Sequence, residues 1–399
     1  MNILSSIYCR TFQQVMHIAI PFLPYRSPVI WNSVQDQIEY FKSKNISRVL
    51  LVTDKGIRNA GLTKKIEESN RRNGIQVTVF DDTHPNPTTS DIQNASKLYN
   101  DNNCQALIGF GGGSSIDCAK AVGISIAYPG KPMKKFGGIL KVQKKIPLLV
   151  AIPTTAGTGS ETTLAAVVVD SDTRHKYAIN SFPLIPKFAI LDPENTFTLP
   201  PHLTSTTGMD ALTHAVEAFI GQSTTKQTRR DSLEATKLIF QNIQKAYENG
   251  KDPEARKNML HAAFLAGRAF TVSYVGYVHA VAHSLGGKYN TPHGLANSVL
   301  LPIVLEAYGK SAWKKLKLLG VAAGVCSPED SPENGAKKFI ESIKQLNKSM
   351  NIPQKLDNIQ DQDIPALAKK AAKEGNPLYP VPKLFTSKQL EKFYKAVQN

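Results

Sequence analysis

The sequence is poor in cysteine and tryptophan and has no long apolar run. Its 399 residues include four cysteines and two tryptophans. The cysteines are widely spaced and form no Cys-x-x-Cys pair. We therefore expect no disulfide framework and a reducing, cytoplasmic location. The apolar stretch at residues 15–23 is interrupted by His17 and Pro21. Since no stretch reaches the roughly 18 to 20 apolar residues that span a bilayer, we expect neither a membrane span nor a signal peptide.

Acidic residues are scarce relative to basic ones. There are 48 Lys and Arg residues against 32 Asp and Glu residues, which gives a formal net charge of +16 at pH 7. Such a charge can attract nucleic acid, anionic membrane or acidic ligands. The basic residues are scattered, however, and neither an aromatic platform nor a nucleic-acid motif lies among them. We therefore favour a solvated basic surface and predict no nucleic-acid partner.

Short apolar, β-branched segments alternate with polar helical segments in the first half of the chain. The predicted strands are residues 49–53, 77–80, 106–110, 148–152, 166–169 and 188–191. Predicted helices between them include residues 91–99 and 117–126. Continuous apolar strands separated by helices are typical of a parallel sheet that is covered on both faces.

The pattern changes after a linker rich in helix and strand breakers at residues 192–201. Residues 216–219, 233–247 and 259–270 carry apolar side chains at helical spacing. We predict an α/β N-terminal domain of residues 1–198, with an arm at 1–23, and an all-helical C-terminal domain of residues 199–399. The cleft between two such domains is the predicted small-molecule site.

A glycine cluster follows the predicted strand at 106–110. Gly111, Gly112 and Gly113 stand between this strand and the start of a helix. Glycine lets the backbone approach a ligand closely, and a helix N-terminus favours a phosphate. Ser114 or Ser115 is expected to cap the helix. Because the segment is neither a Rossmann G-x-G-x-x-G nor a P-loop, by itself it leaves open both an anion site and a tight structural turn.

Two more polar segments follow buried strands. The loop at residues 152–161 contains two glycines and four hydroxyl groups, and Thr154, Thr155 and Thr158 can hydrogen-bond a phosphate, a ribose or a carboxamide. Asp54 ends the first strong strand, where a carboxylate accepts hydrogen bonds from an adenosine ribose and repels a 2′-phosphate; a helix cap is the alternative role. Two such loops after parallel strands indicate one extended ligand with a pyrophosphate, such as a dinucleotide.

Metal-ligand side chains occur in pairs four residues apart. Asp210 and His214 share one helix face, His279 and His283 share another, and His293 follows on a predicted turn. One carboxylate with imidazoles suits Zn²⁺ or Fe²⁺ and suits Mg²⁺ or Ca²⁺ badly. The spacing alone does not say which three or four of these five bind. The remaining histidines are interpreted as structural: His17, His84, His175, His202 and His261.

Together these motifs resemble the iron-containing, or group III, alcohol dehydrogenase family. The resemblance extends roughly from Pro24 to the C-terminus, and it is densest at residues 111–117, 153–161, 208–214 and 279–294. Residues 8–13 and 375–382 also look like one bacterial branch of the family. The resemblance implies the dehydroquinate synthase-like fold, in which a dinucleotide-binding α/β domain precedes a helical metal-binding domain.

The resemblance also implies a role for each site residue. The metal ligands would be Asp210, His214, His279 and His293, and His283 would be a catalytic histidine that moves a proton. The cofactor-binding residues would be Asp54, Gly111, Gly112, Gly113, Ser114, Asp117, Thr154, Thr155, Thr158 and Lys176. The implied metal is Fe²⁺, with Zn²⁺ as the alternative. NAD(H) is expected over NADP(H), because the carboxylate of Asp54 repels a 2′-phosphate.

The predicted reaction is reversible hydride transfer between a primary or small alcohol and its aldehyde or ketone. A divalent metal lowers the pKa of the alcohol, and a nicotinamide cofactor exchanges the hydride. The family further implies a homodimer or a higher homo-oligomer.

Two other interpretations stay open from the sequence. A glycerol dehydrogenase-like or dehydroquinate synthase-like relative on the same fold would also pair NAD with a metal, typically zinc. A basic protein that binds nucleic acid or membrane belongs to a different class. Cofactor-dependent turnover of an alcohol or aldehyde distinguishes the enzymes from the binding protein, whereas salt-sensitive retention on DNA without turnover favours the binding protein.

Overall fold

The chain folds as two compact units. A computed structural model describes residues 3–399; residues 1 and 2, the first of the predicted arm, lie outside the described residues. One unit is Pro24–Thr198, and the other combines the N-terminal segment up to Leu23 with Leu199–Asn399. Among the described helices, none combines the length and the apolar character that crossing a membrane requires.

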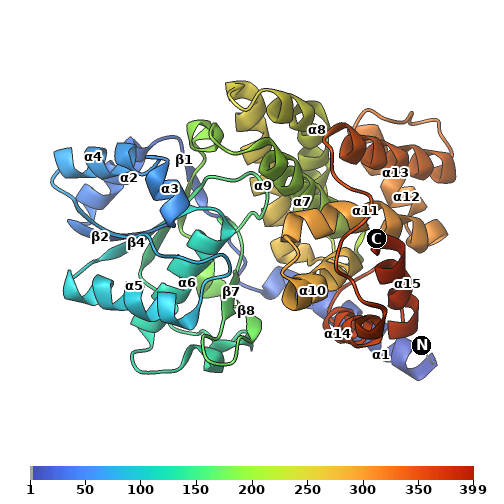
Figure 1. The fold of residues 1–399 in the computed structure, drawn as a ribbon, viewed down its shortest axis with the longest axis horizontal. Coiled ribbons are helices and arrows are strands. Elements are labelled where there is room, and N and C mark those ends of the chain that lie inside the picture. Colours follow the sequence, from blue (N-terminus) through green and yellow to red (C-terminus); the bar gives the residue numbers. More distant parts are fainter. Residues whose placement is uncertain (1–2) are drawn as a thin grey trace. The chain divides into compact units, whose positions relative to one another are not determined.

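A six-stranded parallel sheet forms the centre of the Pro24–Thr198 unit (Figure 1). In spatial order its strands are β1 (Val29–Trp31), β9 (Phe188–Ile190), β6 (Leu148–Pro153), β4 (Ala106–Gly111), β2 (Arg48–Val52) and β3 (Gln76–Phe80). From β2 the chain moves outward to β3 and then returns to the other side of β2 to form β4. The strand order therefore reverses between β2 and β4, and ligands of open α/β sheets bind at the carboxyl ends of strands next to such a reversal.

Helices cover both faces of this sheet, as predicted (Figure 1). They are α2 (Val34–Ser43), α3 (Lys55–Asn59), α4 (Lys64–Arg72), α5 (Thr89–Asp101) and α6 (Gly113–Ala127). Side chains alternate along β2: Leu50 and Val52 pack with α5 and α6, while Val49 and Leu51 pack with α2 and α4. Because both of its faces are buried, the strand is continuously apolar. The sequence analysis predicted the strand from this apolar run.

A second, three-stranded sheet corrects one prediction. Its spatial order is β5 (Gly138–Ile139), β8 (Lys176–Asn180) and β7 (Ala165–Val169). The apolar segment of β7 was expected in the parallel sheet, but β7 pairs antiparallel with β8. Ala166 and Val168 are fully buried in the same core as α6, which gives β7 the apolar character of a central parallel strand. The strand β8, of mixed polarity, and the very short β1 and β5 carry no comparable apolar signal, and local periodicity did not predict them; the family resemblance implied a strand at Lys176.

The second unit is helical. Its helices are α1 (Ile3–Ala19), α7 (Pro201–Ile220), α8 (Lys226–Glu248), α9 (Pro253–Ser273), α10 (Tyr277–Tyr289), α11 (His293–Tyr308), α12 (Trp313–Ala322), α13 (Pro332–Ser349), α14 (Ile364–Gly375) and α15 (Ser387–Val397). Short 3₁₀ helices in the chain are η1 (Ile20–Phe22), η2 (Met133–Phe136), η3 (Phe182–Leu184), η4 (Pro193–Thr196), η5 (Gly309–Ser311) and η6 (Asp361–Asp363). The last thirteen residues of α7, 208–220, are all buried, so this helix forms the centre of the unit. The predicted helical segments 216–219, 233–247 and 259–270 lie within α7, α8 and α9.

The N-terminal arm belongs to the helical unit and not to the α/β unit to which the sequence analysis assigned it. Arg10 of α1 donates a hydrogen bond of 2.7 Å to the carbonyl of Val381, and Gln13 donates one of 2.7 Å to the carbonyl of Tyr379. Both carbonyls lie in the segment that joins α14 to α15. Because these partners are main-chain atoms 371 and 366 residues away, no local sequence pattern indicated them.

Candidate metal and cofactor sites

Four side chains from three helices meet inside the helical unit. Asp210 and His214 lie on α7, His279 lies on α10, and His293 is the first residue of α11. One ligand atom from each of them, a carboxylate oxygen or a ring nitrogen, lies within 4.8 Å of the others. The sequence analysis placed His293 on a turn, whereas it begins a helix after the N-cap residue Pro292. These are the four ligands that the family resemblance implied, and metal binding by them stays a prediction.

The backbone of α11 comes unusually close to α7 beside this cluster. A Cβ added at Gly294 would lie 2.5 Å from the carbonyl oxygen of Thr206, closer than real Cβ contacts allow. Only a glycine after His293 therefore lets the first turn of α11 approach α7. This explains why the cluster combines a ligand with a glycine directly after it.

The ring of His279 is held by Glu217 of α7. Nδ1 of His279 lies 2.6 Å from Oε2 of Glu217, and both side chains are buried. The same carboxylate accepts hydrogen bonds from the backbone N–H groups of Gly276 and Val278, at 2.7 and 2.8 Å. Burial, and then the neighbouring histidines, lower the pKa of His279 well below its usual value, which favours the neutral form of the ring. With Nδ1 donating to the carboxylate, Nε2 keeps its lone pair for a cation.

The side-chain amide of Asn297, on α11, lies at the point where the lone pairs of three ligand side chains converge. Its Nδ2 lies 2.7 Å from Oδ1 of Asp210, 3.2 Å from Nε2 of His279 and 3.1 Å from Nε2 of His293. An amide nitrogen carries only two hydrogens, so it cannot satisfy three acceptors at once. A divalent cation satisfies such a group of lone pairs better, and one carboxylate with three imidazoles suits Fe²⁺ or Zn²⁺. The residues present therefore fit a bound metal.

His283 lies beside the four-residue cluster. Its ring stacks on that of His293 with 5.2 Å between the centroids, and its side chain is 41% exposed. Nδ1 of His283 lies 2.6 Å from Oε1 of Glu374, and the same oxygen accepts a 2.7 Å hydrogen bond from the hydroxyl of Tyr379. Burial tends to raise the pKa of Glu374, but the charge of His283 and these two hydrogen bonds outweigh burial and lower it. The ionised carboxylate fixes the orientation of the His283 ring.

Sequence reasoning missed Glu217, Asn297 and Glu374. Glu217 follows His214 by three residues, and Asn297 follows His293 by four, so both lie on the helix faces that carry the ligands. This spacing was a usable signal. Glu374 had none, because it lies on another helix, 91 residues from its partner His283.

The predicted cofactor segments lie at the carboxyl ends of three adjacent parallel strands. Asp54 follows β2, residues 111–113 join β4 to α6, and residues 154–158 follow β6. The backbone N–H of Thr154 donates a 3.0 Å hydrogen bond to the carbonyl of Gly111, which ties the two loops together. The structure thus brings the predicted loops to the edge where the strand order reverses. That they bind a cofactor stays a prediction.

The start of α6 differs from the expected capping. Gly112 is the N-cap residue, and no side chain caps the helix. Ser115 donates a 3.3 Å hydrogen bond to Oδ2 of Asp54, and the hydroxyl of Ser114 accepts one of 3.2 Å from the backbone N–H of Asn86. Without a side-chain cap, the first N–H groups of α6 can bind an anion.

Asp54 fulfils the alternative role that the sequence left open. It is the N-cap of α3, and its Oδ1 accepts a 3.0 Å hydrogen bond from the N–H of Ile57. Within residues 3–399, Oδ2 accepts only the longer hydrogen bond from Ser115. The cap and a contact with a ribose are compatible, because a carboxylate accepts about four hydrogen bonds.

Asp117 takes part in a buried network within the α/β unit. Its carboxylate accepts hydrogen bonds from the N–H of Val167, at 2.9 Å, and from the hydroxyl of Ser160. The fully buried Lys120 lies 3.6 Å from it and donates to Thr163 at 2.8 Å, and burial lowers the pKa of Lys120 to about 8. The observed role of Asp117 is to join α6 to β7, and a direct contact with a cofactor stays a prediction.

Lys176 is the first residue of β8. Its Nζ donates a 2.6 Å hydrogen bond to Oδ1 of Asn86, whose backbone N–H contacts Ser114. Partial desolvation of the amine lowers the pKa of Lys176, although the residue as a whole is exposed. The lysine is therefore linked through Asn86 to the first turn of α6.

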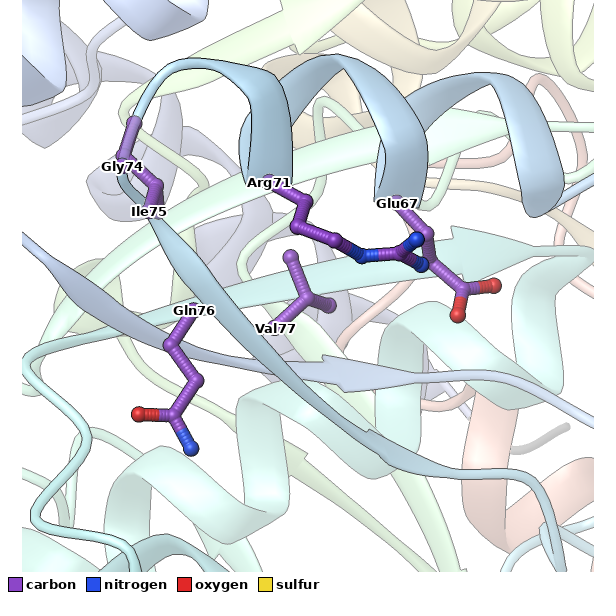
Figure 2. A pocket seen from close by; sticks show the side chains of 6 residues that line it. All are labelled: Glu67, Arg71, Gly74, Ile75, Gln76 and Val77. Carbon is purple, nitrogen blue, oxygen red and sulfur yellow. The ribbon is translucent and has the colours of Figure 1, made fainter.

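A surface pocket of the α/β unit lies away from these loops (Figure 2). It is lined by Glu67, Arg71, Gly74, Ile75, Gln76 and Val77. Figure 2 places Arg71 and Glu67 on α4 and Val77 on the edge strand β3. None of its lining residues is a predicted site residue, so it has no part in the chemistry proposed below.

Comparison with known family models covers nearly the whole chain. The model described as "Iron-containing alcohol dehydrogenase" matches residues 29–193. The model described as "Fe-containing alcohol dehydrogenase family, C-terminal" matches residues 204–398. The first match spans the sheet and the predicted cofactor loops, and the second spans all four residues of the cluster.

Individual relatives lead to the same family. Alcohol dehydrogenase 4 of Saccharomyces cerevisiae is 36% identical over 341 residues, which are 85% of this chain and 88% of the relative. The 1,3-propanediol dehydrogenase of Klebsiella pneumoniae is 38% identical over 333 residues, 82% of this chain and 86% of the relative. The crystal structure of a 1,3-propanediol oxidoreductase matches with a TM-score of 0.89 at 34% identity, covering 93% of this chain and 98% of that one. The chain therefore belongs to the iron-containing alcohol dehydrogenase family.

Proposed function

We propose that this protein is a metal-dependent, NAD-linked alcohol dehydrogenase that interconverts a primary or other small alcohol and its aldehyde or ketone. The observation that carries the proposal is the group of one carboxylate and three imidazoles, buried except for the partly exposed His293, with ligand atoms within 4.8 Å of one another. An NAD-dependent methanol dehydrogenase of Bacillus methanolicus, 34% identical over 352 residues, supports the choice of cofactor. We propose Fe²⁺ as the metal, with Zn²⁺ as the alternative.

When bound, the metal supplies a Lewis acid that lowers the pKa of the alcohol, and the nicotinamide supplies the hydride acceptor. Asp210, His214, His279 and His293 would hold the cation. His283 would accept the proton of the alcohol at Nε2 and pass it toward solvent, because its Nδ1 is engaged by Glu374. Its partial exposure gives the ring the access to water that this role requires.

The proposed cofactor contacts follow from the order of the strands. Residues 111–113 and the first N–H groups of α6 would bind the pyrophosphate, as helix N-termini do after glycine loops. Thr154, Thr155 and Thr158 would donate hydrogen bonds to the phosphates or to the nicotinamide end. Asp54 would accept hydrogen bonds from the adenosine ribose.

Anaerobic purification with metal analysis, followed by a panel of alcohols and aldehydes with NAD(H) and NADP(H), tests the proposal. The expected result is about one divalent metal per chain and turnover of small alcohols with NAD(H). A zinc protein that turns over only glycerol would support the glycerol dehydrogenase alternative. A protein that binds metal and NADH but turns over no alcohol or aldehyde would contradict the proposal.

The choice of cofactor should depend on the charge of Asp54. The variant Asp54→Asn keeps a side chain that caps α3 well, so the fold should lose little stability, whereas Asp54→Gly also removes the cap. Removal of the charge should raise kcat/KM with NADP(H) relative to NAD(H) by roughly 10-fold, equivalent to about 1.4 kcal/mol. Equal kcat/KM for the two cofactors in the unsubstituted enzyme would refute the role.

Glu374 should act as a positioning residue for His283. In Glu374→Gln the ring loses its charged partner, so kcat should fall roughly 10- to 100-fold while metal content and the KM for the alcohol change little. Glu391→Gln, on α15, is the matched control and should leave kcat unchanged. If Glu374→Gln instead raised KM with normal kcat, Glu374 would be part of substrate binding and not of proton movement.

A further inference from the structure

The outward face of α1 is mainly apolar, with Thr11 and Gln14 as exposed polar residues on it. Its exposed large side chains are Ile3 (79%), Leu4 (77%), Ile7 (57%), Tyr8 (61%), Val15 (60%) and Ile18 (59%), and Phe22 of η1 follows at 85%. Thirteen large hydrophobic side chains are exposed among the described residues, and these seven are more than half of them. Single exposed apolar residues are ordinary on protein surfaces, but a concentration on one element marks an interaction site.

These side chains share one side of the helix. At about 100° per residue, the six on α1 fall within an arc of about 140°. The opposite side holds the buried residues Cys9 and Gln13, and Arg10 beside them donates to the carbonyl of Val381. Polar contacts therefore attach one side of α1 to the unit, and this attachment leaves the apolar side facing outward.

The two helices that flank the segment holding α1 are strongly basic. The segment that accepts its hydrogen bonds joins α14 to α15. Exposed lysines on these two helices and their connection are Lys369, Lys370, Lys373, Lys383, Lys388, Lys392 and Lys395. Only two acidic residues, Glu374 and Glu391, lie among them, and residues 3–23 contain none. Among residues 3–399, no ion pair joins any of these lysines to a carboxylate.

We propose that α1, together with the basic surface of α14 and α15, docks the protein on an anionic phospholipid bilayer. An apolar helix face enters the region between headgroups and acyl chains, and nearby lysines are attracted to anionic headgroups. The long lysine side chains reach the headgroups while their methylene groups stay near the apolar layer. A second copy of the chain fits less well, because a two-fold interface through this face brings two like-charged surfaces together.

Flotation with phospholipid vesicles tests the proposal on the full-length, metal-loaded protein. Vesicles of phosphatidylcholine alone are compared with vesicles that contain phosphatidylglycerol at about a third of the lipid. Binding to the anionic vesicles should be at least roughly 10-fold stronger, and it should weaken as salt is raised from about 0.05 M to about 0.5 M. Equal binding to both vesicles, or binding to neither, would overturn the proposal.

Paired variants assign the binding to this surface. Ile7→Ser with Ile18→Ser should reduce vesicle binding roughly 10-fold or more, whereas Leu318→Ser, an exposed apolar site on α12, should not. Replacement of Lys388, Lys392 and Lys395 by glutamine should reduce binding to the anionic vesicles more than the same change at Lys131, Lys134 and Lys135 of the α/β unit. The far-UV circular dichroism and alcohol turnover of these variants should stay normal, because none of the residues lies in the metal cluster or the cofactor loops.

Light scattering after size-exclusion chromatography tests whether a second copy of the chain covers this face instead. If the unsubstituted protein is an oligomer that Ile7→Ser with Ile18→Ser dissociates, a second copy covers this face and the proposal is wrong. If the oligomeric state is the same in both proteins while vesicle binding is lost, the membrane assignment stands. The test is independent of the proposed dehydrogenase activity, since it reads lipid binding and not turnover.

Discussion

The variants His279→Ala and His293→Ala should purify with little metal and without alcohol dehydrogenase activity. Each removes one imidazole from a group of four donors whose ligand atoms lie within 4.8 Å of one another. Three remaining ligands hold a divalent cation much more weakly, and in His279→Ala the buried carboxylate of Glu217 also loses its imidazole partner and keeps only two backbone donors. Metal analysis after anaerobic purification, together with the initial rate of NADH formation, measures both effects.

His283→Ala is the matched control from the same helix. It should retain about one metal per chain and lose roughly 10²-fold or more in rate, which is the usual contribution of a general acid or base. His283 lies one turn from His279, yet its Nδ1 is engaged by Glu374 outside the four-residue cluster. If His283→Ala were empty of metal and His279→Ala full, the two roles would have to be exchanged. If its rate were unchanged, His283 would only contribute to packing.

The variant Gly112→Val should bind NADH much more weakly while keeping a normal metal content. A Cβ at Gly112 would lie 3.5 Å from Cγ2 of Thr155, which is ordinary van der Waals contact, and the backbone there is extended with φ −73° and ψ −174°. The backbone at this position therefore has room for a Cβ, and the added volume of a larger side chain obstructs a phosphate that approaches the first turn of α6. We expect the Kd for NADH to rise roughly 10- to 100-fold, equivalent to about 1.4 to 2.8 kcal/mol, as measured by fluorescence titration.

Two further variants sharpen the Gly112→Val test. Gly112→Ala adds one methyl group and should give a smaller effect in the same direction. Gly111→Ala is a contrast, because Gly111 has φ +147° and an added Cβ would lie 2.6 Å from the hydroxyl of Ser115. It should lower the thermal midpoint of unfolding as well as the affinity. An unchanged Kd in a folded Gly112→Val protein would show that no phosphate binds at this loop.

Local periodicity in the sequence predicted most of the fold. The buried strands β2, β4, β6 and β9 appear as apolar runs because helices cover both faces of their sheet. The edge strand β3 is only partly buried, and it was recognised from its valines and Phe80. The same reasoning misassigned β7, whose buried side chains resemble those of a central strand although it pairs antiparallel with β8. Burial leaves a pattern in the sequence, whereas the choice of a pairing partner depends on distant residues.

The candidate site was likewise predicted from local spacing only in part. Spacing of four residues brought Asp210 and His214 to one helix face and His279 and His283 to another, because an α-helix repeats every 3.6 residues. The sequence alone did not decide among these five potential ligands, and the family resemblance supplied the division. In the structure, Asp210, His214, His279 and His293 converge, while His283 pairs with a carboxylate from α14.

The sequence by itself determined the alternating α/β half, the helical half and the residue types that gather in the metal cluster, since each follows from short-range periodicity and side-chain chemistry. Only the tertiary structure decided that the N-terminal arm packs on the helical unit, that Asp54 caps α3, and that Glu374 faces His283. The arm and the Glu374 pair rest on contacts across 91 to 371 residues, and such contacts depend on how the elements pack against one another. The cap is local, but a carboxylate at a strand end fits both a cap and a ribose, and only the observed hydrogen bond to Ile57 established the cap.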